Sequence, residues 1–107
     1  MIDRYERLLP TIRAAARQHD YAIGLQGSGE RDLDLVAVPW TWQAVPAGEL
    51  VEAIRVAVGG YIEFDIPGRN PTVKPHGRLA WSIHVGGRLY VDLSVTPLTP
   101  APANDTP

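Results

Sequence analysis

The sequence contains no cysteine, no long apolar run and no large excess of charge of either sign. Without cysteine, neither a disulfide framework nor a thiolate metal site can form. No stretch approaches the roughly 20 apolar residues that a membrane-spanning helix needs. The start MIDRYERLLP carries charges where a signal peptide would have an apolar run. We therefore expect a cytoplasmic protein with no membrane partner.

The formal net charge of -2 at pH 7 bears on the possible partners. Capture of duplex nucleic acid through its phosphates needs a strongly basic face. The small negative net charge therefore argues against strong binding of duplex nucleic acid. It permits binding of a single nucleotide through a metal ion and a few basic side chains.

The 107 residues, of which 45% are hydrophobic, predict one domain with one modest core. Apolar periodicity and the positions of glycine and proline divide the chain into expected elements. Helices are expected at residues 2–18 and 47–58, strands at 21–26, 32–38, 61–66, 79–85 and 89–95, and a loop at 67–78. This order predicts an α+β fold at residues 1–96, with a small mixed or antiparallel sheet and two helices on one face. The Pro/Thr-rich tail at 97–107 is expected to be disordered.

Two kinds of residue set the expected ends of these elements. Pro10 removes a backbone donor inside the first helical pattern, which predicts a kink or a break there. Pro39 cannot donate to a ladder and is expected to end the second strand. Gly59 and Gly60 are expected to stop the second helix, because glycine tolerates the left-handed cap conformation.

Three aspartates form the main candidate site. Strand side chains alternate between faces, so Asp32 and Asp34 point the same way. Asp92 lies in the middle of the last strand, where an aspartate is unfavourable unless it has a partner. If the two strands are neighbours, three carboxylates converge and can bind Mg²⁺ or Mn²⁺, which take oxygen ligands and keep positions for phosphate. The third acid would then act as general base toward an attacking hydroxyl.

This arrangement resembles the nucleotidyltransferase superfamily, whose members share the DNA polymerase beta-like fold. The resemblance spans roughly residues 5 to 95 and rests on Gly27-Ser28, the Asp32-x-Asp34 pair and Asp92 on a later strand. It implies that Gly27 and Ser28 contact the phosphates of a nucleoside triphosphate. It also implies that the three aspartates are the catalytic residues and the ligands of two metal ions. The chain is also similar to short bacteriophage-type proteins with a G-S-x-x-R-D-x-D-L core.

Basic residues supply further candidates for nucleotide binding. Arg31 sits beside the Gly-Ser turn and could contact a phosphate, or it could pair with a neighbouring acid. Lys74, His76 and Arg78 form a basic cluster on the expected loop, and the cluster could also include Arg69. Lys74 and Arg78 could hold triphosphate oxygens or the phosphate of an acceptor. The alternative is a solvated loop without a partner.

The sequence departs from the family pattern in two ways. The usual spacer between Gly-Ser and Asp-x-Asp is longer and often contains a short helix. No second domain follows to bind an acceptor. Three hypotheses therefore stay open: an enzyme that transfers a nucleoside monophosphate from NTP to a hydroxyl, a catalytically silent module on the same fold that binds a nucleotide or a partner protein, and a purely structural domain whose acids are solvated or paired with arginine.

Overall fold

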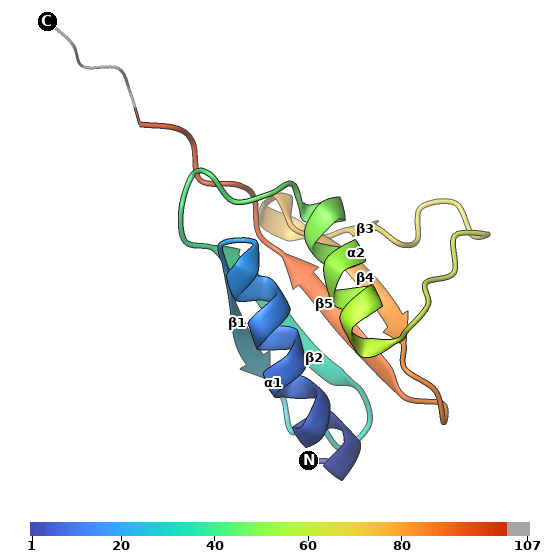
Figure 1. The fold of residues 1–107 in the computed structure, drawn as a ribbon. Helices are drawn as coiled ribbons and strands as arrows, with labels where there is room; N and C mark the ends of the chain where they lie inside the picture. The colour runs from blue at the N-terminus through green and yellow to red at the C-terminus, as the bar shows by residue number, and fades with distance from the viewer. Residues whose placement is uncertain (103–107) are drawn as a thin grey trace, which may run out of the picture.

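A computed structural model describes residues 1–102 as two helices and a five-stranded mixed sheet. The elements are, in chain order, α1 (Asp3–Gln18), β1 (Tyr21–Gln26), β2 (Leu33–Pro39), α2 (Ala47–Val58), β3 (Thr72–Val73), the short 3-10 helix η1 (Pro75–Gly77), β4 (Leu79–His84) and β5 (Tyr90–Val95). The strands lie in the order β1-β2-β5-β4-β3 across the sheet (Figure 1). The predicted α+β class is confirmed, and the sheet is mixed.

The centre of the sheet is the parallel pair β2 and β5. On either side, β1 pairs with β2 and β4 pairs with β5 as antiparallel neighbours. Antiparallel neighbours can be joined by a short turn, whereas a parallel pair needs a long crossover. Here the crossover includes α2, β3 and β4, and it joins two strands that are far apart in the sequence.

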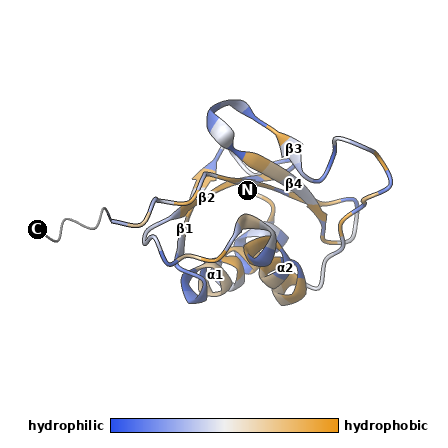
Figure 2. Cartoon of the chain, turned by 90° about the horizontal axis from the view of Figure 1, so that it is seen from above, coloured by the Kyte–Doolittle hydropathy of each residue, from blue (hydrophilic) through white to orange (hydrophobic). Residues whose placement is uncertain are grey.

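The alternating strand pattern separates a buried face from an open one. In β2, Leu33, Leu35 and Ala37 are buried, and the residues between them are more exposed. Helices α1 and α2 both cover the buried face, and the opposite face carries no α-helix in residues 1–102 (Figure 2). The prediction that both helices lie on one face is therefore confirmed.

The chain was predicted to kink or break at Pro10; helix α1 is continuous through this residue, so the break does not occur. Pro10 is exposed, while Tyr5, Ile12 and Ala16 are buried on the other side of the helix. A proline removes one hydrogen bond from the helix, and its ring clashes with the preceding turn. Because buried residues lie both before and after Pro10, packing on the sheet holds the two halves in one helix.

Helix α2 has the predicted bounds, and two glycines follow it with different functions. Gly59 caps the helix in the left-handed conformation, at φ 65°. Gly60 packs tightly against β4, because a Cβ atom there would lie 2.6 Å from the backbone oxygen of His84. A side chain at Gly60 would therefore force the chain away from the edge of the sheet.

The strand expected at residues 61–66 is wrong. Tyr61 makes one isolated antiparallel bridge with His84, and no strand follows it. Further along the edge of β4, Asn70 accepts a hydrogen bond from the backbone N–H of Ser82 through its side chain. The edge of β4 is thus covered at separate points, and the alternating segment between Tyr61 and Asn70 has no strand partner.

Smaller differences occur elsewhere. The observed β2 starts and ends one residue later than expected, and the loop predicted at 67–78 contains the two-residue strand β3 and η1. Residues 97–102 form neither helix nor strand, while residues 103–107 of the expected disordered tail lie outside the described residues. Neither described helix has the length and apolar character that crossing a membrane requires.

Candidate functional site

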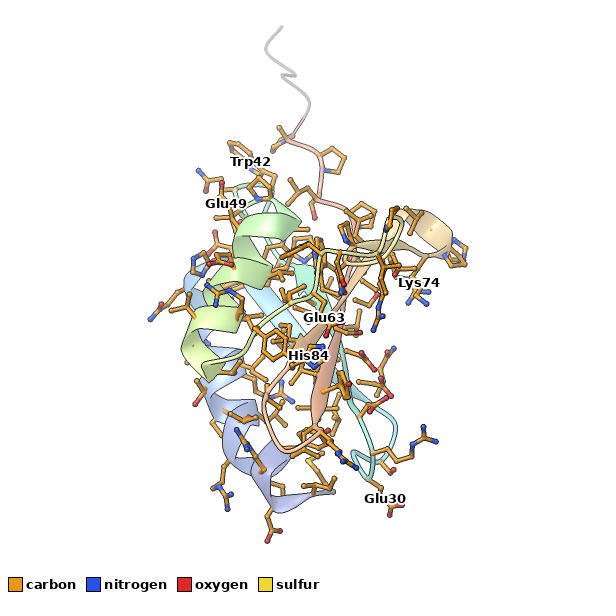
Figure 3. The ribbon with its side chains drawn as sticks, turned by 90° about the vertical axis from the view of Figure 1, so that its right-hand side faces the viewer. Glu30, Trp42, Glu49, Glu63, Lys74 and His84 are labelled. Atoms are coloured by element: carbon orange, nitrogen blue, oxygen red, sulfur yellow. The ribbon has the colours of Figure 1, made fainter. Side chains whose placement is uncertain are left out.

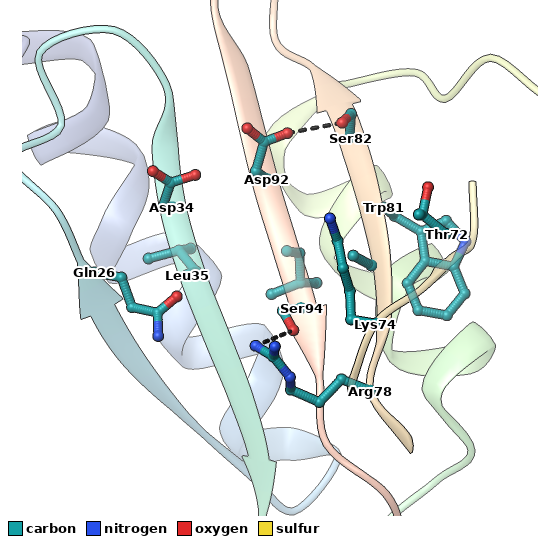
Figure 4. Close-up of a pocket in the computed structure, with 12 residues that line it drawn as sticks. Gln26, Asp34, Leu35, Thr72, Lys74, Arg78, Trp81, Ser82, Asp92 and Ser94 are labelled. Carbon is teal, nitrogen blue, oxygen red and sulfur yellow. Dashed lines mark hydrogen bonds between the residues drawn. The ribbon is translucent and has the colours of Figure 1, made fainter. Parts of the chain in front are cut away.

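Four polar side chains form one row across the open face of the sheet, one from each of four neighbouring strands. The strand register places Gln26 opposite Asp34, Asp34 opposite Asp92, and Asp92 opposite Ser82. The row crosses the central parallel pair, so the two aspartates are direct neighbours (Figure 4). The sequence predicted that the acids meet only if β2 and β5 are neighbours, and in the structure the two strands are paired.

Asp32, just before β2, brings a third carboxyl group to this row. Burial raises the pKa of Asp92, the hydrogen bond from Ser82 lowers it, and the negative charges of Asp32 and Asp34 raise it again. The charges of Asp32 and Asp34 therefore disfavour the charged form of Asp92.

The orientation of Asp92 is fixed by the neighbouring strand β4 and by Asn70 beside it. The Ser82 hydroxyl donates a hydrogen bond of 2.7 Å to Oδ1 of Asp92. Ser82 is itself held by its backbone N–H, which donates to Asn70 at 2.8 Å. Asn70 is only 4% exposed, and its side-chain amide donates to the carbonyl of Glu63. This chain of bonds leaves Oδ2 of Asp92 free to act on a ligand.

The Gly-Ser turn lies directly beside Asp34. Gly27 has φ +70°, and a Cβ atom at this position would lie 3.6 Å from Oδ2 of Asp34. Residues 27–32 and Asp34 line a hollow of about 450 Å³. Ser28 and Arg31 are exposed along it. The predicted phosphate-contacting residues and two of the acids thus share one hollow.

A second hollow of about 400 Å³ lies on the other side of the acids. Lys74 and Arg78 line it together with Asp34, Asp92 and Ser94, as Figure 4 shows. Arg78 donates through Nε to the carbonyl of Pro75 and through Nη1 to Ser94. Asp34 lines both hollows. The structure therefore separates the predicted nucleotide-binding residues into two groups, which meet at this aspartate.

Tyr5 is a residue of the site that sequence reasoning missed. Its hydroxyl donates to the backbone carbonyl of Arg31 and accepts a 3.1 Å hydrogen bond from the N–H of Tyr90. Arg31 precedes Asp32, and Tyr90 begins the strand that carries Asp92. Burial raises the pKa of Tyr5, so its hydroxyl stays protonated and able to donate. Its apolar helical spacing indicated only that Tyr5 belongs to the core.

His84 continues the open face beyond the acid row. Its ring stacks on Tyr61 with centroids 4.3 Å apart and tilts against Tyr90 at 4.5 Å. Glu63 lies beside it, with 3.6 Å between Nε2 and the carboxyl oxygen (Figure 3). These contacts are those of a packed structural residue at the end of the sheet.

Arginine does not neutralise the acids. In the part of the chain that the structure describes, the ion pairs are Arg55 with Glu52 and His84 with Glu63. The pairing considered for Arg31 or Arg78 with the aspartates is therefore not seen. In the same residues, no three His, Asp or Glu side chains stand in a ready-made metal-binding arrangement. The acids lie on one face of the sheet without closing around a common point.

Comparisons of the chain with protein-family models, with curated proteins and with solved structures gave no match.

Proposed function

We propose that this protein is a metal-dependent nucleotidyltransferase that transfers a nucleoside monophosphate from a nucleoside triphosphate to a hydroxyl group. One observation carries the proposal: Asp34 and Asp92 are register partners on the central parallel strands, and Asp32 lines the same hollow as Asp34. The glycine-rich turn at Gly27 lies against the same acids. Glycine-rich turns can present backbone N–H groups to phosphate, and grouped carboxylates bind hard cations.

The chemistry of the three acids fits Mg²⁺ or Mn²⁺. Asp32, Asp34 and Asp92 offer only oxygen donors, which these cations prefer. Burial and, to a smaller extent, the charges of Asp32 and Asp34 raise the pKa of Asp92, and a bound cation would favour its charged form. A bound cation would polarise the phosphoryl group and favour deprotonation of the acceptor hydroxyl.

The chain's own groups supply the remaining functions. The turn at Gly27 and Ser28 holds phosphate oxygens, and Arg31 adds a positive charge beside them. Asp92, oriented by Ser82, takes the proton from the acceptor hydroxyl. The acceptor oxygen forms a bond to the α-phosphorus, and the bond from that phosphorus to the bridging oxygen of pyrophosphate breaks.

The direct test is a titration of ¹⁵N-labelled protein with Mn²⁺, followed by ATP or GTP. Paramagnetic broadening is expected at Asp32, Asp34 and Asp92, and nucleotide is then expected to shift the amide signals of Gly27 and Ser28. An unchanged spectrum at millimolar metal and nucleotide would contradict the proposal.

Matched variants show whether the acids of the row are responsible. Asp34→Asn keeps the shape of the side chain but removes a charged oxygen ligand. We expect it to weaken Mn²⁺ binding at least about tenfold, by loss of a carboxylate from the ligand set. Asp65→Asn is the control, because Asp65 is exposed and lies outside the row. Equal weakening by both variants would indicate a general charge effect instead of a site.

A second candidate function is a silent module that binds a nucleotide or a partner protein without catalysis. The observation that favours it is the turn between β1 and β2, where residues 27–32 contain no helix to add amide groups for phosphate. This candidate predicts nucleotide binding with no release of pyrophosphate. An assay of pyrophosphate from NTP with a panel of hydroxyl compounds separates it from the enzyme.

A further inference from the structure

We infer that the hollow lined by Lys74 and Arg78 is the acceptor subsite, and that it takes a small hydroxyl compound bearing a phosphate group. The inference rests on the proposed function, since it needs a nucleotide in the hollow formed by the Gly27 turn. It would give this single domain both subsites of a transferase.

The two hollows differ in which acid they expose. Asp32 lines only the hollow of the Gly27 turn, whereas Asp92 lines only the hollow of Lys74 and Arg78. Asp34 lies between them and lines both. A general base must contact the hydroxyl that it deprotonates. Because Asp92 is the proposed base, the hydroxyl must approach from the side of Lys74 and Arg78.

The charges of the second hollow match a phosphate. Lys74, the only lysine of the sequence, and Arg78 bring two positive charges to a chain with a net charge of -2. In residues 1–102 neither side chain takes part in an ion pair, so both charges remain available to a ligand. Their loop is held by a 2.9 Å hydrogen bond from the N–H of Lys74 to the carbonyl of Arg78. In Figure 4 the Lys74 side chain reaches along the hollow in the direction of Asp92.

The size and the other walls of the hollow favour a small polyol or sugar phosphate. A volume of about 400 Å³ falls in the usual range for small-molecule sites. Gln26, Thr72 and Ser94 add amide and hydroxyl groups to its lining, which suit the hydroxyl groups of such a compound. With its phosphate between Lys74 and Arg78, the compound would direct a hydroxyl to the free oxygen of Asp92.

The experiment is an amide NMR titration with Mg²⁺ in place of the paramagnetic Mn²⁺. Mg²⁺ and a non-hydrolysable NTP analogue are added first. Shifts of Gly27 and Ser28 in this step report the donor site. Ribose 5-phosphate or glycerol 3-phosphate is then added, and shifts are expected at Thr72, Ser82 and Ser94. Ribose and glycerol, which lack the phosphate, are expected to bind at least about tenfold more weakly.

Variants assign the phosphate to its two cations. Lys74→Gln and Arg78→Gln are each expected to weaken binding of the sugar phosphate at least about tenfold and to leave the affinity for the NTP analogue unchanged. Arg69→Gln is the control, because Arg69 is an exposed arginine nearby in sequence that does not line the hollow. Its affinity for both ligands is expected to equal that of the wild type.

The outcomes separate the two proposals. If the NTP analogue causes no shifts in the first step, the proposed function fails. If the analogue binds normally but the phosphate compounds do not bind up to about 20 mM, the acceptor subsite alone is wrong. Loss of NTP affinity in Lys74→Gln would place the triphosphate in this hollow and overturn the inference. Binding of a single-stranded oligonucleotide at least about tenfold tighter than the sugar phosphates would overturn it in favour of a polymer acceptor.

Discussion

At the scale of single residues, Asp92 is a group that the fold disfavours in its charged form. Burial and the two neighbouring acids raise the pKa of this carboxyl above 3.8, its ordinary value, and only the Ser82 hydrogen bond opposes them. The folded state therefore binds a proton more readily than the unfolded chain. The contribution of Asp92 to the free energy of unfolding is therefore fully present below the ordinary pKa. It is lost as the pH rises through the raised pKa of the folded state.

We predict that Asp92→Asn makes the protein more stable at neutral pH. The amide keeps the shape of the side chain and an oxygen that accepts from Ser82, but it removes the buried charge. At a pH well below 3.8 the wild-type carboxyl is protonated, so the gain should disappear there. Thermal unfolding of both proteins across this pH range measures the effect. A Tm difference that does not change with pH would show that charge is not its cause.

At the scale of secondary-structure elements, Tyr5 links α1 to the beginnings of the two central strands. Its hydroxyl contacts the backbone of Arg31 and Tyr90, which flank the segments that carry Asp32 and Asp92. The side chain is fully buried, so no solvent replaces these bonds if the hydroxyl is removed. The helix therefore helps to hold the two strands in the register that brings the acids together.

We predict that Tyr5→Phe destabilises the protein by about 1–3 kcal/mol, because it leaves a backbone carbonyl and an N–H without their partner. Urea unfolding gives the change, and hydrogen exchange at the Tyr90 amide should become faster. Tyr21→Phe is the matched control, since that buried hydroxyl donates to the carbonyl of Val45, away from the acids. It should cost a similar stability and leave exchange at Tyr90 unchanged. If hydrogen exchange at the Tyr90 amide became faster to the same extent in both variants, Tyr5 would have only a general packing function.

At the scale of the whole molecule, the described secondary structure ends with β5, at Val95. Thr96 still belongs to the domain, because its backbone N–H donates to the carbonyl of Ala37 at 3.0 Å. Beyond it, residues 97–102 are exposed and form neither helix nor strand. The elements that build the core and the candidate site are therefore contained in residues 1–96.

We predict that a chain ending at Pro97 keeps the stability of the full chain, with a Tm within about 1 °C of it. The physical reason is that residues 98–102 bury little surface and make no ladder contacts. Scanning calorimetry of the two proteins measures the difference. A Tm lowered by more than about 5 °C, equivalent to about 1 kcal/mol for a domain of this size, would mean that the removed segment packs on the domain.

Local physics in the sequence determined most of the elements. Apolar periodicity located α1 and α2, and the glycines after α2 gave its end, because helix formation and capping depend on residues within a few positions of each other. Alternation located β1, β2, β4 and β5 to within one residue. The same alternation failed at residues 61–66, because a strand also needs a partner, and a periodicity of two contains no information about partners.

Only the tertiary structure decided which acids face one another and what surrounds them. The pairing of Asp34 with Asp92 depends on the long crossover from β2 to β5, which no local propensity specifies. The bridging hydroxyl of Tyr5 and the side-chain contact of Asn70 with β4 likewise join residues far apart in the chain. The sequence thus determined the faces on which Asp34 and Asp92 lie, since side chains alternate along a strand. Their convergence and the two hollows beside them arose only when distant strands packed together.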